Sequence, residues 1–142
     1  MKAILVHHAE AVGPDVDPQR PLSARGREQA QRLADALLAS GVVPAAIWHS
    51  GKLRSRQTAE AFLRRSPFAD FRMVRGLRPE DPPVWIRGDL LAESRDILLV
   101  GHMPQIAALA HSLAPGVMTF PLHGLVGFDR DGDAWTESVR FE

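Results

Sequence analysis

The stretch DILLVGHMPQIAALAHSLA, residues 96–114, contains the strongest secondary-structure signal in the chain. DILLVG (96–101) is apolar along its length, as expected for a central strand of a parallel sheet that is covered on both faces. After the histidine at position 102, residues 103–114 have the apolar spacing of a helix with a proline near its first turn. The stretch therefore predicts a strand, a tight turn that carries His102, and a helix.

Outward from this stretch, the chain alternates between short apolar runs and longer amphipathic segments. Strands are predicted at 2–6, 44–50 and 71–74, and helices at 23–40, 52–65 and 83–92. Ser23 is the expected N-cap of the first helix and Gly41 its expected stop. The tail, 124–141, predicts a hairpin around Asp131-Gly132. We therefore expect an α/β fold, a three-layer α/β/α sandwich with a mostly parallel central sheet and a C-terminal antiparallel hairpin.

Size and composition narrow the class of protein. The 142 residues fit one domain, 1–142, and show no internal repeat and no break in composition. Seventeen basic residues balance seventeen acidic ones, so no strong field recruits nucleic acid or an anionic membrane. The absence of cysteine excludes disulfides, thiolate metal sites and a cysteine nucleophile. No apolar run is long enough to span a bilayer or form a signal-peptide core, and we expect a cytoplasmic protein.

Chemically capable side chains follow three of the predicted strands. His7 and His8 come after the first strand, Ser50 after the second, and His102 after the strand at 96–101. In open α/β sheets, ligands bind beyond the carboxyl ends of the strands. We therefore expect these side chains, distant in sequence, to meet at one edge of the sheet.

The residue types at this edge favour an oxyanion such as phosphate. His102 immediately precedes a helix, and a helix N-terminus is a natural anion site. Arg54 lies in the first turn of its own helix and is expected to point to the same crevice. A transition metal is the alternative, but His7 and His8 are adjacent, and neighbours on a strand point to opposite faces. A solvated strand end for His8 remains open. For His123 an approach to a pocket and a surface turn are both open, and the surface turn is favoured.

Four blocks of sequence carry a resemblance to a known family. They are HHAEA (7–11), RPLSARGREQA (20–30), HSGKLRSRQTAE (49–60) and LLVGHMP (98–104). In order and spacing they resemble the histidine phosphatase superfamily, which has the phosphoglycerate-mutase-like fold. The short chain is similar in particular to the phosphohistidine phosphatases of the SixA-type branch.

The resemblance implies roles for individual residues and requires no metal and no cofactor. His8 matches the nucleophile that attacks phosphorus, Arg54 the arginine that grips the phosphoryl oxygens, and His102 the second phosphate-binding histidine. The family places an arginine before the nucleophile, and this chain has His7 there, which removes a permanently charged bidentate ligand. His7 and, by our own reading of the RPLS stretch, Arg20 are further candidate phosphate ligands.

The second departure concerns the acid that protonates the leaving group. Many members of the superfamily place an acid at the position that Pro79 occupies in this chain. Glu80 and Asp81 follow directly and are the candidate proton donors. Because a phosphohistidine ring can leave as neutral imidazole, it needs an acid less than an alkyl phosphate does. The sequence therefore favours a P–N bond as substrate.

Three functions remain in consideration. The first is a phosphohistidine phosphatase acting on a protein such as a histidine phosphotransfer domain, since few residues remain to build a lid over the site. The second is a phosphomonoesterase of small phosphorylated molecules. The third is a phosphohistidine-binding module whose catalysis is weakened by His7.

Overall fold

The computed structural model describes residues 1–116 and 119–142. Its strands are β1 (Lys2–His7), β2 (Ala46–His49), β3 (Asp70–Met73), β4 (Ile97–Gly101), β5 (Leu125–Asp131) and β6 (Ala134–Phe141). Its helices are α1 (Ala24–Ala39), α2 (Leu53–Leu63), α3 (Pro83–Ala92) and α4 (Gln105–Leu113). Among the described residues, no helix is long and apolar enough to cross a membrane.

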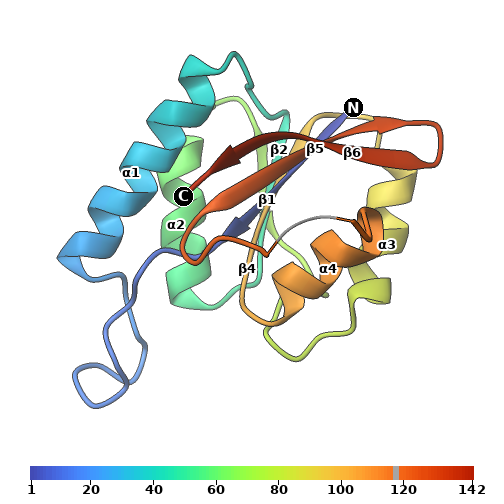
Figure 1. Cartoon of the computed structure of the whole chain (residues 1–142). Helices are drawn as coiled ribbons and strands as arrows, with labels where there is room; N and C mark the ends of the chain where they lie inside the picture. The colour runs from blue at the N-terminus through green and yellow to red at the C-terminus, as the bar shows by residue number, and fades with distance from the viewer. Residues whose placement is uncertain (117–118) are drawn as a thin grey trace.

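The six strands form one mixed sheet in the order β3-β2-β4-β1-β5-β6. The first four of these pair in parallel, whereas β5 runs antiparallel to β1, and β6 antiparallel to β5. Gly132, at a φ of 61°, lies in the turn between β5 and β6. Figure 1 shows this hairpin at the end of the chain. The predicted sheet, mostly parallel with a C-terminal hairpin, is confirmed.

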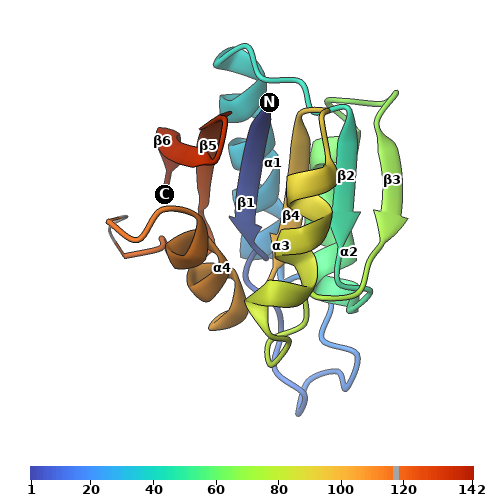
Figure 2. The ribbon, with the colours of Figure 1, turned by 90° about the vertical axis from the view of Figure 1, so that its right-hand side faces the viewer.

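Alternate residues of the central strands pack against helices on opposite faces of the sheet. Ile4 and Leu98 belong to the core beneath α1 and α2. Leu5 and Leu99 belong to the core that α3 and α4 cover. Figure 2 shows α3 and α4 in front of the sheet and α1 and α2 behind it. The predicted three-layer sandwich is confirmed, and it follows from burial of both faces of the sheet.

Local signals set the ends of the first helix as predicted. The Ser23 Oγ accepts a hydrogen bond from the backbone N–H of Gly26 at 3.0 Å, and Gly41 has a φ of 89° just beyond the C-cap. The other boundaries lie within two residues of the prediction, and α3 has the predicted bounds at both ends. The last helix begins at Gln105 rather than at 103, because Pro104 occupies its N-cap position.

The register of the parallel strands brings their carboxyl ends to one edge of the sheet. His7 at the end of β1 lies opposite Gly101 of β4, and His49 of β2 lies opposite Val100. The segments that follow these strands carry His8, Ser50 and His102. The expected convergence is therefore a direct consequence of strand pairing.

Candidate active site

His8 is the first residue beyond β1 and is almost fully buried, with 8% of its surface exposed. Its backbone N–H donates to the Gly101 carbonyl at 3.0 Å, and its Nδ1 lies 2.7 Å from the Ala9 carbonyl oxygen. A carbonyl only accepts, so the ring hydrogen is on Nδ1 and Nε2 carries the free lone pair. Burial, opposed by the Ala9 hydrogen bond, lowers the pKa of His8 to about 4. His8 is therefore a neutral imidazole with a nucleophilic nitrogen at pH 7.

His102 lies beside His8, with the two ring centroids 4.9 Å apart. Its Nε2 is 2.7 Å from the Ser50 Oγ, and its Nδ1 has no hydrogen-bond partner in the part of the chain described. Ser50 is fixed in turn, because its backbone N–H donates to the Ser55 Oγ at 3.0 Å. Burial lowers the pKa of His102 to about 2, with smaller contributions from His8 and Arg54. His102 is thus also neutral at pH 7.

Arg54 supplies positive charge to these histidines from the first turn of α2. Its guanidinium contributes to the lowered pKa values of both His8 and His102. The helix is tied to the segment after β1, because the Thr58 Oγ accepts the Ala9 N–H at 3.0 Å and donates to the Arg54 carbonyl at 2.8 Å. This connection holds Arg54 against the end of β1.

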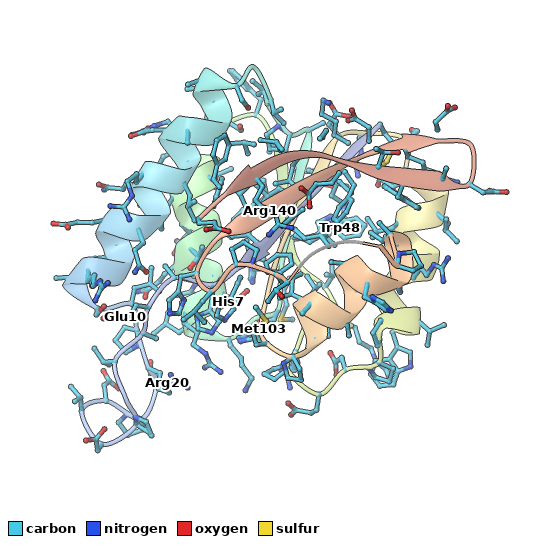
Figure 3. All side chains as sticks on the ribbon, viewed as in Figure 1. His7, Glu10, Arg20, Trp48, Met103 and Arg140 are labelled. Atoms are coloured by element: carbon cyan, nitrogen blue, oxygen red, sulfur yellow. The ribbon has the colours of Figure 1, made fainter. Side chains whose placement is uncertain are left out.

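Arg20 also lies close enough to act on the site. Burial is the main cause of the lowered pKa values of His8 and Arg54, and the charge of Arg20 lowers both further. Its own Nε donates to the Val12 carbonyl at 3.0 Å, which leaves its other guanidinium nitrogens for other partners. Figure 3 shows His7 at the end of the sheet from which the loop carrying Arg20 extends.

His7 is paired with His123, for which the sequence favoured a surface turn over an approach to a pocket. The rings of His7 and His123 are stacked, with centroids 4.8 Å apart and planes 8° from parallel. The His123 backbone N–H donates to the His7 Nδ1 at 2.8 Å, and the His123 Nδ1 donates to the His8 carbonyl at 2.7 Å. His123 does lie in a turn, but the turn faces the site. The antiparallel pairing of β5 with β1 brings this turn to the end of β1. This pairing joins distant parts of the chain, so no local sequence pattern predicts the position of His123.

His7 and His8 do not point to opposite faces, and this prediction is wrong. Their ring centroids are 4.5 Å apart, because β1 ends at His7 and strand alternation no longer governs His8. The adjacency of His7 and His8 is therefore no reason to exclude a metal site. The geometry of the three histidines is the remaining observation on this question.

His7, His8 and His123 present ring nitrogens that lie within 4.8 Å of one another. Three nitrogens bound tetrahedrally to zinc would lie about 3.4 Å apart. A metal sits near the plane of each imidazole that binds it, whereas the rings of His7 and His123 are stacked and nearly parallel. His7 Nδ1 is also occupied by the His123 N–H. The cluster as arranged fits hydrogen bonding better than metal ligation, and a metal-free site stays a prediction.

The two candidate acids lie in different surroundings. Asp81 lines an open cleft of about 320 Å³ that also includes Ser50, while Glu80 is exposed and is not part of that lining. The Asp81 Oδ2 accepts the backbone N–H groups of Gly76 at 3.1 Å and Arg78 at 3.0 Å. One oxygen of Asp81 therefore stabilises the loop before α3. Asp81 thus shares this cleft with Ser50, whose Oγ contacts His102.

Comparison with known proteins agrees with this architecture. A family model described as histidine phosphatase superfamily (branch 1) matches residues 4–81. A sequence comparison with curated proteins finds no match.

Several solved structures share the fold. The protein histidine phosphatase SixA, in a complex with tungstate, has a TM-score of 0.84 at 21% identity, covering 99% of this chain and 96% of that one. A SixA-type protein of Agrobacterium tumefaciens has a TM-score of 0.82 at 24% identity, with 99% and 97% covered. A phosphoserine phosphatase of Entamoeba histolytica, bound to phosphoserine, has a TM-score of 0.73 at 14% identity, with 98% and 95% covered.

Proposed function

The chain belongs to the histidine phosphatase superfamily, and we propose that it hydrolyses phosphohistidine on a phosphorylated protein, through a phosphoryl intermediate on His8. The observation that carries the proposal is the hydrogen bond from His8 Nδ1 to the Ala9 carbonyl. It fixes the tautomer in which Nε2 is free to attack phosphorus, with Arg54 and His102 beside it. A neutral imidazole needs no separate base for this attack.

The first step transfers the phosphoryl group between two nitrogen atoms. His8 Nε2 forms a bond to phosphorus as the bond from phosphorus to the substrate's ring nitrogen breaks. When the other ring nitrogen of the substrate carries a proton, the leaving group is a neutral imidazole and no acid is required. Arg54, His102, His7 and Arg20 are the candidate ligands for the phosphoryl oxygens, and binding of these oxygens is the main source of catalysis in phosphoryl transfer.

The second step returns His8 to its starting state. Water attacks phosphorus and the electrons of the P–N bond return to His8 Nε2, while both hydrogens of the water leave with the inorganic phosphate. The Ala9 carbonyl holds the proton on His8 Nδ1 throughout. His8 therefore leaves as a neutral imidazole, which is a far better leaving group than an imidazole anion.

A P–N substrate is favoured because Pro79 occupies the position of the family acid. Asp81 lies beside the site, but one of its oxygens is engaged by two backbone N–H groups. An alkyl phosphate would need a proton donor at its alkoxide oxygen. A phosphomonoesterase of small molecules is the second candidate, and the cleft that joins Ser50 to Arg75, Arg78 and Asp81 is the observation in its favour.

Three substrates separate these functions. The full chain is incubated with a phosphorylated histidine phosphotransfer domain, with phosphoramidate and with an alkyl phosphate such as phosphoserine, with and without a chelator. We expect rapid release of phosphate from the phosphohistidine protein, slow release from phosphoserine, and no effect of the chelator. Faster turnover of phosphoserine would favour the phosphomonoesterase. Tight binding of phosphohistidine without turnover would indicate that the protein is a binding module. Activity that is lost on chelation and restored by Zn²⁺ or Mn²⁺ would overturn the metal-free mechanism.

A further inference from the structure

We infer that His7 binds the phosphoryl group as an uncharged donor, through an Nε2–H whose position is fixed by the backbone N–H of His123. This inference rests on the proposed function for the identity of the ligand and goes beyond it in two ways. It states in which form His7 replaces the arginine of the family, and it gives His123 a role as a positioning residue.

The tautomer follows from one hydrogen bond. The His123 backbone N–H points at the His7 Nδ1 over 2.8 Å, so Nδ1 must offer a lone pair. A neutral imidazole that accepts at Nδ1 carries its hydrogen on Nε2. His7 and His8 are therefore opposite tautomers, because His8 has its hydrogen on Nδ1 and its lone pair on Nε2. The His7 ring can donate a hydrogen bond from Nε2, and the His8 ring can attack phosphorus with its Nε2 lone pair.

Protonation of His7 would break this arrangement. It would place an N–H on Nδ1, facing the His123 N–H, and two donors would then meet without an acceptor. The charged and titratable groups that act on His7 are His8, His123 and Arg54, and His7 acts in turn on His102. Burial, followed by the charges of His8, His123 and Arg54, lowers the pKa of His7 to about 3. His7 thus donates without carrying charge at neutral pH.

The turn that carries His123 is built to aim its N–H at His7. His123 has a φ of 53°, and the turn is closed by the Gly124 N–H bonded to the Pro121 carbonyl at 3.2 Å. The Gly124 carbonyl accepts the His7 backbone N–H at 3.0 Å. The His123 side chain stacks on His7 and donates to the His8 carbonyl. The turn is therefore attached to both members of the histidine pair.

This arrangement has a consequence for phosphate binding. A donor that needs no added proton keeps its strength from mildly acidic to mildly alkaline pH. It attracts the dianion less strongly than a guanidinium would, since it lacks permanent charge. We therefore expect moderate phosphate affinity, with no contribution from the titration of His7.

Nuclear magnetic resonance of the ¹⁵N-labelled full chain tests the tautomer without any turnover. The signals of His7 are assigned by their loss in His7→Gln. We expect a protonated Nε2 and an unprotonated Nδ1 at every pH from 5 to 9, with and without vanadate. A protonated Nδ1, or a His7 signal that titrates with a midpoint near ~6.5, would overturn the inference. Failure to hydrolyse phosphohistidine would instead count against the proposed function and would not change these signals.

Two substitutions test the donor itself. His7→Phe keeps a ring of similar size without Nε2–H, and vanadate affinity is expected to fall about tenfold or more, as for the loss of a hydrogen bond to a charged group. His7→Gln retains an N–H donor near that position and should recover part of the affinity. Urea unfolding of both variants establishes that they are folded. Equal vanadate affinity of folded His7→Phe and the unchanged chain would refute the role.

His123 is tested through its backbone. His123→Gly keeps the N–H and suits the positive φ, so it should retain the His7 tautomer although the stacked ring is lost. His123→Val strains the turn, because a β-branched residue disfavours that φ, and His7 should then gain a detectable population of the other tautomer. An unchanged His7 spectrum in a folded His123→Val variant would show that His123 does not position His7.

Discussion

The Ser50 Oγ lies 2.7 Å from the His102 Nε2, and this contact joins the residue after β2 to the residue after β4. Ser50 is itself held by its N–H bond to Ser55, whose hydroxyl donates to the Val100 carbonyl at 2.8 Å. The orientation of the His102 ring therefore depends on a chain of hydrogen bonds that ends on the backbone of β4. Ser50 acts through His102, which makes it a positioning residue in the proposed reaction.

Removal of the Ser50 hydroxyl should slow the phosphoryl transfer. In Ser50→Ala the His102 ring loses its partner at Nε2, and a hydrogen bond of about 1 kcal/mol corresponds to roughly a fivefold lower kcat. Steady-state kinetics with phosphoramidate measures the change. Ser40→Ala, which removes a hydroxyl bonded to the Leu37 carbonyl at the end of α1, is the matched control and should leave kcat unchanged. A kcat of Ser50→Ala equal to that of the control would exclude a positioning role.

A covalent intermediate on His8 is the second prediction. Rapid quenching of the enzyme with a ³²P-labelled substrate should trap an acid-labile, base-stable phosphoryl group on this residue. His8→Ala should lose both the label and the turnover, because the free Nε2 is removed. Turnover of His8→Ala near the rate of the unchanged chain would show that another group attacks phosphorus.

The buried histidines should make stability depend on pH in a defined direction. His7, His8 and His102 have folded pKa values of about 3, 4 and 2, against about 6.5 in the unfolded chain. Between pH 6.5 and 4 the unfolded state therefore binds protons that the folded state does not. Their contribution to stability is complete above pH 6.5 and is lost as the pH falls.

Each such histidine changes the free energy of unfolding by about 1.4 kcal/mol per pH unit in this window. Urea unfolding at pH 6.5, 5.5 and 4.5 measures the total slope. His8→Gln removes one of these histidines and should reduce that slope by about 1.4 kcal/mol per pH unit. The carboxylates contribute equally to the slope in both proteins, so they do not affect the difference. An identical slope in the two proteins would mean that His8 is not held neutral in the folded state.

The sequence predicted the fold because its signals are local and repeated. The apolar run at 96–101 and the cap at Ser23 each depend on a few neighbouring residues, and both lie where they were expected. The strand ends bring His8 and His102 together for the same reason. The approach of His123 to the site was the less favoured alternative, because its contact with His7 spans 116 residues and depends on the pairing of β5 with β1. Local periodicity contains no information of that range.

The error about His7 and His8 has a different cause. The predicted strand already ended at residue 6, so both histidines lay beyond it and strand alternation should not have been applied to them. The tautomers of both rings depend on backbone partners, Ala9 for one and His123 for the other. The sequence pattern located the site, but individual hydrogen bonds to the backbone set the protonation of its histidines.

The last prediction uses the arginine that is missing at position 7. In His7→Arg a guanidinium replaces a single neutral donor by two fixed donors and a permanent charge. Because hydrogen bonds to charged groups contribute roughly 1.5–3 kcal/mol, vanadate and phosphate should bind about tenfold more tightly or better. His7 is only 4% exposed and stacks on His123. The double variant with His123→Gly therefore provides room for the longer side chain.

Calorimetric titration with vanadate and phosphate, from pH 5 to 9, measures the gain and its pH dependence. With a neutral donor at His7, the unchanged chain and the arginine variant should give parallel curves that differ in affinity. His111→Arg, which adds the same charge at the exposed end of α4, is the control and should show little gain. An affinity of the unchanged chain that falls through pH 6.5, while that of the variant does not, would mean that His7 binds phosphate as a cation. Equal affinities of His7→Arg and the unchanged chain would mean that position 7 does not reach the phosphoryl group, although His8 would remain the expected nucleophile.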